Sequence, residues 1–322
     1  MKVAFVHGDP DGIVSAVILD SIHNLDLIVF TTPYKLKDDL SVTVEKYNNI
    51  NEIYIADLAC SDFTTKNIIK LLSENAEVHF FDHHRYSLDL SGIVNTFVLD
   101  YSKCAARIVY DYYNVKNEHL EKLVRIAEYS DSYTEDVSEE IVHEHDLLYS
   151  SVSFNVDDNN FRLLLVKELR SKLPSQIEEV KKRSKQYKAK YRECERIFNN
   201  SVIHEDKRKI IYMISDSDYR KVKGFISKIT SRSLSRKNKK IAITIFRPNL
   251  MEYVITVRSD KRSEYNSGFI VENIIKEFGG KGGGHRHAAS VAVSDSVIDK
   301  VIERLKTLWE RWENEIHYHW WQ

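Results

Sequence analysis

The first half of the chain alternates short apolar runs with longer segments of mixed polarity. The apolar runs are VAFV at 3–6, LIVF at 27–30, IYIA at 53–56 and VHFF at 78–81. Runs of this length that are rich in Val, Ile and Phe are typical of strands buried on both faces. Between them, residues 13–22 and 64–74 carry apolar side chains at helical spacing. The pattern predicts βαβ units around a parallel sheet in an α/β domain.

The second half begins with a highly charged segment of helical composition, and Pro174 is well placed to open that helix. Strand-like runs then follow at 209–215, 240–246 and 252–259. After them come a helix, a glycine cluster and a final helix from about Ser294. We therefore predict three parts: an N-terminal parallel-sheet domain at 1–173, a helical linker at 174–200 and a smaller α/β domain at 201–322.

Composition narrows the class of protein. The chain has 322 residues, of which 43% are hydrophobic and 30% charged, so it is long enough to bury a sizeable core. Its three cysteines, Cys60, Cys104 and Cys194, lie far apart, which argues against a disulfide framework and a zinc knuckle. The apolar run at the N-terminus is too short for a signal peptide or a membrane span. We expect a cytoplasmic protein that does not associate with membranes.

Charge is distributed unevenly along the chain. The first 170 residues carry 15 Lys and Arg against 29 Asp and Glu, whereas the remainder carries 32 against 19. The halves thus have formal charges of −14 and +13, which nearly cancel in the net charge of −1. An acidic part that holds divalent cations and a basic part that meets phosphate would produce this split. Solvated helix faces would also produce much of it.

The C-terminal tail holds all four tryptophans, Trp309, Trp312, Trp320 and Trp321. Tryptophan marks buried or interface surface more often than chemistry. We expect the tail to pack against the body of the protein or against a partner subunit, and a homodimer is left open.

The ends of three predicted strands carry polar residues of one kind. Open parallel sheets bind ligands at the carboxyl ends of their strands. The residues that follow the first, third and fourth apolar runs are His7, Asp9 and Asp11; Asp57; and Asp82, His83 and His84. Any single Asp here could be a helix cap, and any single His could be structural. Their joint occurrence at three strand ends favours a common site.

Carboxylates packed at one sheet edge would repel one another, and divalent cations remove that cost. Carboxylate and imidazole ligands without thiolates favour Mn²⁺ or Mg²⁺ over structural zinc. The candidate groups exceed what one such ion would draw from protein while still admitting substrate and water. We therefore predict two divalent cations that share a bridging carboxylate, with Mn²⁺ as the first choice and Mg²⁺ as the second.

These motifs resemble those of a known family. HGDPDG at 7–12, the Asp57 of IADLAC and FDHHR at 81–85 resemble the motifs of the DHH phosphoesterase superfamily. That superfamily includes RecJ exonucleases, nanoRNases, cyclic dinucleotide phosphodiesterases and manganese-dependent inorganic pyrophosphatases. GGKGGGHRHAAS at 279–290 is similar to the GGGHxxAA signature of the DHH-associated C-terminal domain. Ser290 stands where the family usually has Gly, which affects local packing more than chemistry. The resemblance spans nearly the whole chain.

The resemblance implies a role for each motif residue in the first domain. It implies that His7 and Asp9 bind one metal ion, that Asp11 and His83 bind the other, and that Asp57 bridges the two. Asp82 would orient its neighbours, and His84 would act on the substrate phosphate. The family has a further single Asp after the following helices, for which Asp131 is the best match. Asp136 and the pair His143 and His145 are its competitors.

The glycine cluster and a strand end in the second domain are the predicted substrate-binding elements. Five of the ten glycines lie within 279–284. Such a run leaves backbone N–H groups free for an anion-binding nest against a helix N-terminus, although flexible turns look alike. With His285 it would form a phosphate clamp. Arg258 and Ser259 resemble the substrate-binding strand end of the family's C-terminal domain, and a solvated Arg is an equal alternative. The predicted set is Arg258, Ser259, Gly282, Gly283, Gly284 and His285.

Together these features imply a metal-dependent hydrolase with its active site in a cleft between two domains. The expected reaction is hydrolysis of phosphodiester or phosphomonoester bonds, because two cations can activate water and neutralise phosphoryl charge. The chain has no recognisable third domain for long single strands. We therefore expect short oligonucleotides, as in a small nuclease, or small nucleotides as substrates. A hydrolase of polyphosphate or pyrophosphate and a non-catalytic nucleic-acid-binding protein are the alternatives.

Overall fold

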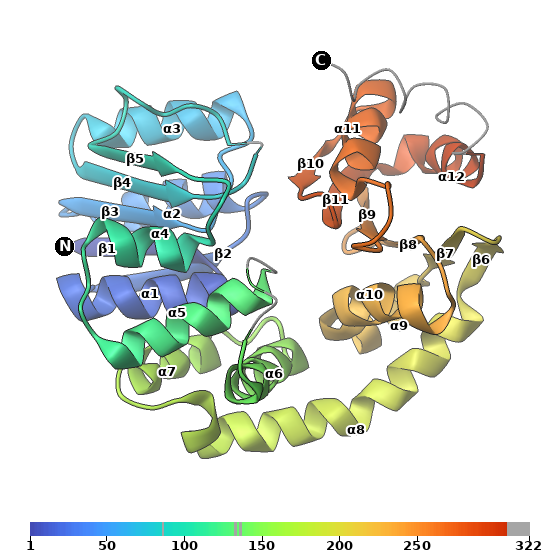
Figure 1. Ribbon diagram of the computed structural model, residues 1–322. Coiled ribbons are helices and arrows are strands. Elements are labelled where there is room, and N and C mark those ends of the chain that lie inside the picture. The colour runs from blue at the N-terminus through green and yellow to red at the C-terminus, as the bar shows by residue number, and fades with distance from the viewer. Residues whose placement is uncertain (86, 132–133, 135–136, 308–322) are drawn as a thin grey trace. The chain divides into compact units, whose positions relative to one another are not determined.

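The computed structural model describes residues 1–85, 87–131, 134 and 137–307 (Figure 1). The chain divides into two compact units, Met1–Arg192 and Glu193–Gln322. The division falls inside one long helix, which lies within the segment expected to link two domains. The predicted limits at 173 and 200 stay a prediction. The tryptophan-rich tail and Asp136 lie outside the described residues.

The first unit contains the N-terminal sheet and helices on both of its faces. Its elements are β1 (Lys2–His7), α1 (Pro10–His23), β2 (Leu27–Thr31), α2 (Leu36–Lys46), β3 (Glu52–Ala56), α3 (Phe63–Ser73), β4 (Glu77–Asp82), β5 (Thr96–Leu99), α4 (Ala105–Tyr112), α5 (Glu118–Ser130), α6 (Glu139–Phe154), α7 (Asn159–Leu169), a 3₁₀ turn (Pro174–Gln176) and most of α8 (Glu178–Asn200).

The strands of this unit form a parallel sheet in the order β2-β1-β3-β4-β5, which confirms the predicted fold class. Alternate residues of each strand face opposite sides of the sheet. Ala4, Val6 and Phe81 pack on the side of α1 and α4, and Val3 and Phe5 on the side of α2 and α3 (Figure 1). Because helices cover both faces, the strands are apolar throughout, which is the pattern that the sequence showed.

The start of α1 is built by the motif that follows β1. Asp9 is the N-cap of this helix and accepts the backbone N–H of Gly12 at 3.1 Å, and Pro10 follows at the first helical position. A Cβ at Gly12 would stand 2.2 Å from the carbonyl oxygen of His7. Only glycine allows the helix to start this close to the strand, so this motif also fixes where its side chains lie.

The second unit holds the rest of the chain. Beyond the end of α8 its elements are β6 (Val202–Glu205), β7 (Lys209–Met213), α9 (Asp216–Val222), a 3₁₀ turn (Lys223–Phe225), α10 (Ile226–Arg236), β8 (Ile241–Phe246), β9 (Glu252–Ser259), α11 (Ser267–Phe278), β10 (Lys281–Gly284), β11 (Ala288–Ser294), a 3₁₀ turn (Asp295–Val297) and α12 (Ile298–Lys306).

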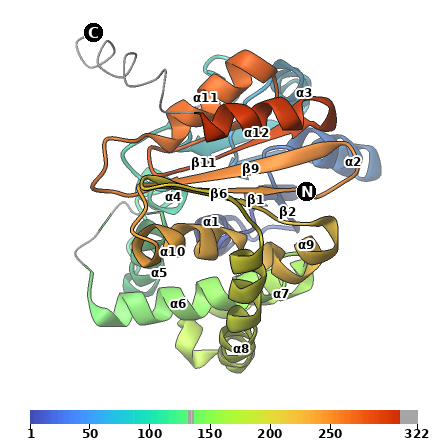
Figure 2. The same ribbon diagram turned by 90° about the vertical axis from the view of Figure 1, so that its right-hand side faces the viewer.

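Its strands form a mixed sheet in the order β10-β11-β9-β8-β7-β6, in which β7 and β8 pair in parallel. Helices α11 and α12 cover one face through a core that includes Ile243, Val257 and Val301 (Figure 2). Helix α10 lies on the other face, where Thr230 is hydrogen-bonded to Thr244. This arrangement confirms the predicted second α/β domain.

The glycine cluster differs from its prediction. The sequence predicts a loop against a helix N-terminus, but Lys281–Gly284 is the edge strand β10, which follows the C-terminus of α11. A Cβ at Gly282 would stand 2.3 Å from the carbonyl oxygen of Ser290 on β11. The predicted loop was wrong because glycine allows two strands to approach each other closely as well as giving the backbone freedom to turn.

Pro174 opens a short 3₁₀ turn, and the long helix α8 that it was expected to open begins at Glu178. Among the described residues, no helix combines the length and apolarity needed to cross a membrane.

Candidate active site

His7 ends β1, and Asp9 begins the following helix. The Nδ1 atom of His7 lies 2.9 Å from Asp9 Oδ2 and 3.7 Å from Asp57 Oδ2. Burial alone would raise the pKa of Asp9, but the charge of His7 and its hydrogen bond outweigh burial and hold that pKa below its usual value. Asp9 therefore carries a negative charge at neutral pH, next to the His7 imidazole, which also lies beside Asp57.

Asp57 directly follows β3 and has a left-handed backbone, with φ at 60°. Asp and Asn tolerate this conformation better than most residues, and holding it costs about 1–3 kcal/mol. Its N–H continues the sheet by donating to the carbonyl of Phe81. The side chain is buried, and Oδ2 has no hydrogen-bond partner in the described part of the chain. A buried carboxylate oxygen that lacks a partner is expected where a cation binds.

A second group of ligand atoms surrounds the ring of His83. Its Nε2 atom lies 3.1 Å from Asp57 Oδ1, 3.5 Å from Asp131 Oδ2 and 3.7 Å from Asp11 Oδ2. One imidazole nitrogen cannot satisfy three carboxylates. The arrangement is that of a cation site in which nitrogen and three oxygens converge.

The two groups share one residue. His7, Asp9 and Asp57 form one set that could hold a metal ion, and Asp11, Asp57, His83 and Asp131 form another. The ligand atoms within each set lie within 4.8 Å of one another. The carboxylate and imidazole donors fit two hard divalent cations. The Asp57 Oδ2 atom, which has no hydrogen-bond partner among the described residues, fits them too. Because Asp57 belongs to both sets, it could contact both cations.

The carboxylates of this cluster are strained electrostatically. Burial raises the pKa of Asp57 well above its usual range, and the charges of Asp9 and Asp11 add to the effect. Burial and then Asp9 raise the pKa of Asp11 to about 6, although two backbone N–H groups at the start of α4 oppose this. Burial, Asp11 and Asp9 likewise raise the pKa of Asp131. Positive charge at the cluster would relieve all three groups.

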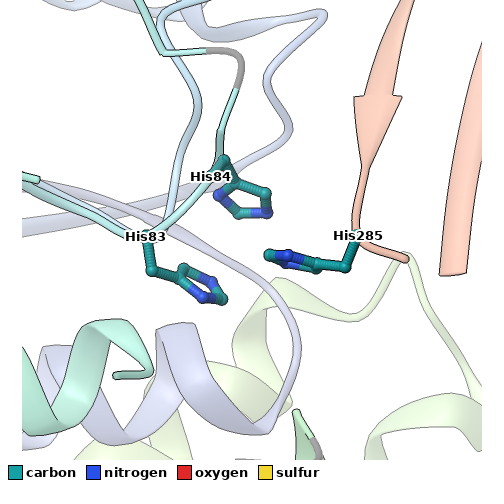
Figure 3. Close-up of side chains that lie close together, drawn as sticks. All are labelled: His83, His84 and His285. Atoms are coloured by element: carbon teal, nitrogen blue, oxygen red, sulfur yellow. The ribbon is translucent and has the colours of Figure 1, made fainter. Parts of the chain in front are cut away.

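Asp82, the last residue of β4, forms a separate hydrogen-bonded pair with His84, whose ring is drawn in Figure 3. His84 Nδ1 lies 2.7 Å from Asp82 Oδ1, and Ser87 Oγ donates to Asp82 Oδ2. Burial lowers the pKa of His84, but the charge and hydrogen bond of Asp82 outweigh it and raise that pKa overall. The carboxylate therefore holds the His84 imidazole through Nδ1 and fixes the orientation of the ring.

Two supports of the cluster were not found from the sequence. Arg162 of α7 is buried and donates to the carbonyl of Gly8 beside the first ligands. The N–H groups of Ala105 and Ala106, at the start of α4, each donate to Asp11 at 2.8 Å. For the second support, the only indication in the sequence was the small residues Cys104, Ala105 and Ala106 at the start of a helix. This indication was too weak to predict the contact with Asp11.

The predicted alternatives to Asp131 lie elsewhere or outside the described residues. His145 packs edge-to-face on Tyr129, with ring centroids 5.0 Å apart, and His143 is exposed. Asp136 lies outside the described residues. The structure thus brings Asp131, rather than either histidine, to the ligands of the first unit.

In the second unit, the predicted residues gather at one edge of the sheet. Arg258 is the second-last residue of β9 and pairs in register with Ala288, while His285 follows β10 in the tight turn to β11 (Figure 3). Arg258 Nη2 donates to Ser227 Oγ at 2.8 Å. Ser259 is buried, and its hydroxyl donates to the carbonyl of Arg286 at 2.9 Å. That bond gives Ser259 a structural contact with the turn.

The glycines of β10 belong to the same edge. Gly282, Gly283 and Gly284 pair with β11, and Gly284 has a φ of 145° directly before His285. A Cβ at Gly284 would stand 2.4 Å from the carbonyl oxygen of Ala288. These glycines therefore shape the turn that presents His285.

Comparison with known proteins bears on both units. Residues 209–312 match the family model of the DHHA1 domain. No curated protein matches the chain. A solved structure of the pGpG-specific phosphodiesterase PggH from Vibrio cholerae has 16% identity and a TM-score of 0.56, over 96% of this chain and 98% of PggH.

Two further solved structures are similar. The DHH domain of a protein assigned to a family of ribosomal proteins has 13% identity and a TM-score of 0.65, over 94% of this chain and 84% of that one. RecJ from Thermus thermophilus in complex with Mn²⁺ has 12% identity and a TM-score of 0.63, over 95% of this chain and 51% of RecJ. At these identities the likeness establishes the fold. The chain therefore shares the fold of these structures, and residues 209–312 match the DHHA1 domain model.

Proposed function

We propose that this protein is a metal-dependent phosphoesterase that hydrolyses phosphodiester or phosphomonoester bonds of short oligonucleotides or small nucleotides. The observation that carries the proposal is Asp57. Its carboxylate belongs to both sets of ligand atoms, and its Oδ2 is buried without a hydrogen-bond partner among the described residues. A structural carboxylate would be fully hydrogen-bonded. PggH, a phosphodiesterase, and RecJ, solved with Mn²⁺, support the same reading of the fold.

In the proposal, His7 and Asp9 hold one divalent cation, Asp11, His83 and Asp131 hold the other, and Asp57 bridges them. Two such cations supply activated water and charge neutralisation for in-line displacement at phosphorus. The chain supplies the geometry. His7 and Asp9 are fixed by the start of α1, and Asp11 is held by the start of α4.

His84 is the proposed proton donor of the site. Asp82 accepts its Nδ1–H and thereby keeps the imidazole protonated and oriented. Nε2 can then donate to a phosphoryl oxygen, or to the leaving oxygen as its bond to phosphorus breaks. Asp82 itself is buried and acts through His84.

The second unit is proposed to bind the substrate. Arg258 offers a planar pair of donors that suits phosphate, and His285 projects from the glycine-bounded turn of β10 and β11. Ser259 and Gly282, Gly283 and Gly284 give that turn its shape.

The test is turnover and metal binding in the same preparations. Wild-type protein with Mn²⁺ should release nucleoside monophosphate from a short labelled oligoribonucleotide. Asp57→Asn keeps a residue that tolerates φ near 60° but removes the charge. It should abolish turnover and weaken Mn²⁺ binding, measured by the electron paramagnetic resonance signal of free Mn²⁺. Asp89→Asn, at an exposed carboxylate outside the cluster, is the matched control.

Other outcomes would select the alternatives. Phosphate release from polyphosphate, with oligonucleotides left intact, would favour the inorganic phosphate hydrolase. Absence of turnover on both substrates with Mn²⁺, Mg²⁺, Co²⁺ and Zn²⁺, together with oligonucleotide binding, would favour a non-catalytic binding protein. Full activity of Asp57→Asn would remove the bridging assignment.

A further inference from the structure

Arg107 of α4 is joined to α5 by two pairs of hydrogen bonds. Its Nε and Nη2 atoms donate to the carboxylate of Glu128 at 2.8 and 3.2 Å. Its Nη1 and Nη2 atoms donate to the carboxylate of Glu121 at 2.9 and 2.6 Å. The Arg107 side chain is 16% exposed. Charge-assisted pairs of this kind are stronger and more directional than single hydrogen bonds. We call these three residues the Arg107 network.

The Arg107 network fixes the position of α5 along α4. Glu121 and Glu128 are seven residues apart on α5, which is about 10 Å along the helix axis, and one guanidinium contacts both. The two helices also pack together, and Ile108 and Leu123 belong to the same buried core. The hydrophobic effect is non-directional, so apolar packing alone allows small shifts. Two opposed pairs of hydrogen bonds define one position.

Each end of the network lies within one helical turn of a group that holds or supplies a predicted metal ligand. On α4, Arg107 directly follows Ala106, whose N–H donates to Asp11 at 2.8 Å. On α5, Glu128 precedes Asp131 by three residues, and the N–H of Asp131 is hydrogen-bonded to the last turn of that helix. A short path of bonds therefore connects Asp11 to Asp131 through the network.

Asp11 and Asp131 are ligands of the same predicted cation position, which the set around His83 forms together with Asp57. Their Oδ2 atoms lie 3.7 and 3.5 Å from His83 Nε2. We call this set the second cation position. The other set contains no residue of α4 or α5; it consists of His7, Asp9 and Asp57. A change in the network should therefore act on one cation position and spare the other.

We propose that Arg107 is a positioning residue that sets the distance between Asp11 and Asp131, and thereby the affinity of the second cation position. This inference rests on the proposed function and goes beyond it, because it assigns control of one metal position to a residue outside both ligand sets. Ligand distances at a metal site must hold to within about 0.2 Å. A small shift of α5 along α4 would thus weaken this position.

The experiment measures Mn²⁺ binding in two backgrounds that each keep one position. Binding is followed without substrate, by the electron paramagnetic resonance signal of free Mn²⁺. In Asp9→Asn the second cation position remains, and adding Arg107→Met should weaken binding by about tenfold. In Asp131→Asn the first set remains, and adding Arg107→Met should change binding by less than about twofold. General destabilisation would weaken both positions alike.

Arg183 provides a matched control. Its side chain is also 16% exposed, and it donates to Glu179 at 2.9 Å and to Asp158 at 2.8 Å. Arg183→Met should lose stability in urea as Arg107→Met does, because both remove a charged donor from two carboxylates. It should keep Mn²⁺ affinity at the second cation position within about twofold of its background.

A conservative variant tests whether geometry or charge matters. Arg107→Lys keeps the positive charge but lacks the planar set of donors that contacts both carboxylates, so it should recover little of the lost Mn²⁺ affinity. Full recovery would overturn the positioning role, because charge alone would then be sufficient. Glu128→Gln, which weakens the same contact, replaces Arg107→Met if that variant does not fold.

Hydrogen–deuterium exchange in the metal-free protein gives a second readout. Arg107→Met should exchange faster than wild type in the last turn of α5, at residues 127–131, because the contact that holds this turn is lost. Arg183→Met should exchange there at the wild-type rate. Unchanged exchange of this turn in Arg107→Met would contradict the inference.

The outcomes separate this inference from the proposed function. Equal losses of Mn²⁺ affinity in the two backgrounds, or unchanged affinity in the Asp9→Asn background, would overturn the positioning role of Arg107. A loss confined to the Asp9→Asn background supports it. A protein that binds Mn²⁺ at both positions but hydrolyses no substrate would fail the proposed function, while the two backgrounds would still decide the role of Arg107.

Discussion

Arg162 donates through Nε to the backbone carbonyl of Gly8 at 2.9 Å, and the two residues are 154 positions apart in the chain. Its other nitrogens donate to Asn159 Oδ1 and to the carbonyl of Val156, at 2.8 and 2.9 Å. Gly8 stands between His7 and Asp9, so a buried cation from α7 fixes the loop that carries the first pair of ligands. A Cβ at Gly8 would stand 2.7 Å from the Arg162 guanidinium.

Arg162→Met should therefore weaken both the fold and the site. Loss of charged hydrogen bonds, with a buried carbonyl left unpaired, should lower the free energy of unfolding by about 3 kcal/mol. Mn²⁺ affinity should fall by about tenfold because the loop loses its support. Urea denaturation and Mn²⁺ titration measure the two effects. Arg170→Met, at an exposed arginine that pairs with Asp20, is the control. Unchanged Mn²⁺ affinity in folded Arg162→Met would contradict the loop's role.

The start of α4 should position Asp11. Both oxygens of Asp11 accept backbone N–H groups there, from Ala105 and Ala106. Ala105→Pro removes one donor at the first helical position, where proline is well tolerated. The preceding Cys104 is already extended, at φ −74° and ψ 162°, as a residue before proline prefers. We expect Mn²⁺ affinity to fall by about tenfold while thermal stability changes little.

A second proline provides the comparison for that variant. Glu118→Pro changes the first position of α5, after the extended residue Asn117, at a helix start that does not contact the ligands. It should leave Mn²⁺ binding unchanged. Equal Mn²⁺ affinities in the two proline variants would show that the α4 hydrogen bonds do not hold Asp11.

Ser87 should act on catalysis through Asp82. Its hydroxyl accepts the N–H of Cys60 at 3.1 Å and donates to Asp82 Oδ2. Ser87→Ala leaves the buried carboxylate one donor short and loosens its hold on His84. We expect kcat to fall by about tenfold with a smaller change in KM, and Ser87→Thr to restore most of it. Steady-state kinetics of nucleotide release provide the measurement. An equal loss in Ser87→Thr would indicate a packing effect instead.

A stack of three rings outside the ligand cluster should contribute less to stability as the pH is lowered. Tyr54 lies between His23 and His79, with centroid distances of 4.5 and 4.9 Å. Burial lowers the pKa of both histidines below their ordinary value of 6.5. At these two positions the unfolded chain binds more protons than the folded chain just below pH 6.5, so their contribution to the free energy of unfolding falls as pH drops through that value.

Urea denaturation at pH 7.5 and 5.5 tests this prediction. His79→Phe keeps a ring on Tyr54 but cannot titrate, so between the two pH values its stability should change less unfavourably than that of wild type. His143→Phe, at an exposed histidine, should keep the wild-type pH dependence. If His79→Phe and wild type lose equal stability between the two pH values, the stack does not account for the effect.

The strand ends and the convergence of the polar residues after them were predictable, but the supports around these residues were not. Runs of Val, Ile and Phe mark doubly covered strands, and the residues after them must share one sheet edge, which brings Asp57 and His83 together. Arg162 supports the site by a contact that no local pattern encodes. The strand β5 was missed because its four residues are only partly buried. β10 was read as a loop because glycine has no strand propensity of its own.

The backbone conformation of Asp57 restricts which residues can replace it. With φ at 60°, this position accepts Asp, Asn and Gly far more readily than any branched or bulky residue. Loss of the charge without loss of the fold is thus open chiefly to Asn and Gly. Any natural or designed descendant that keeps this fold but has lost the proposed activity should carry Asn or Gly at position 57. Either residue at that position would therefore indicate that the activity has been lost.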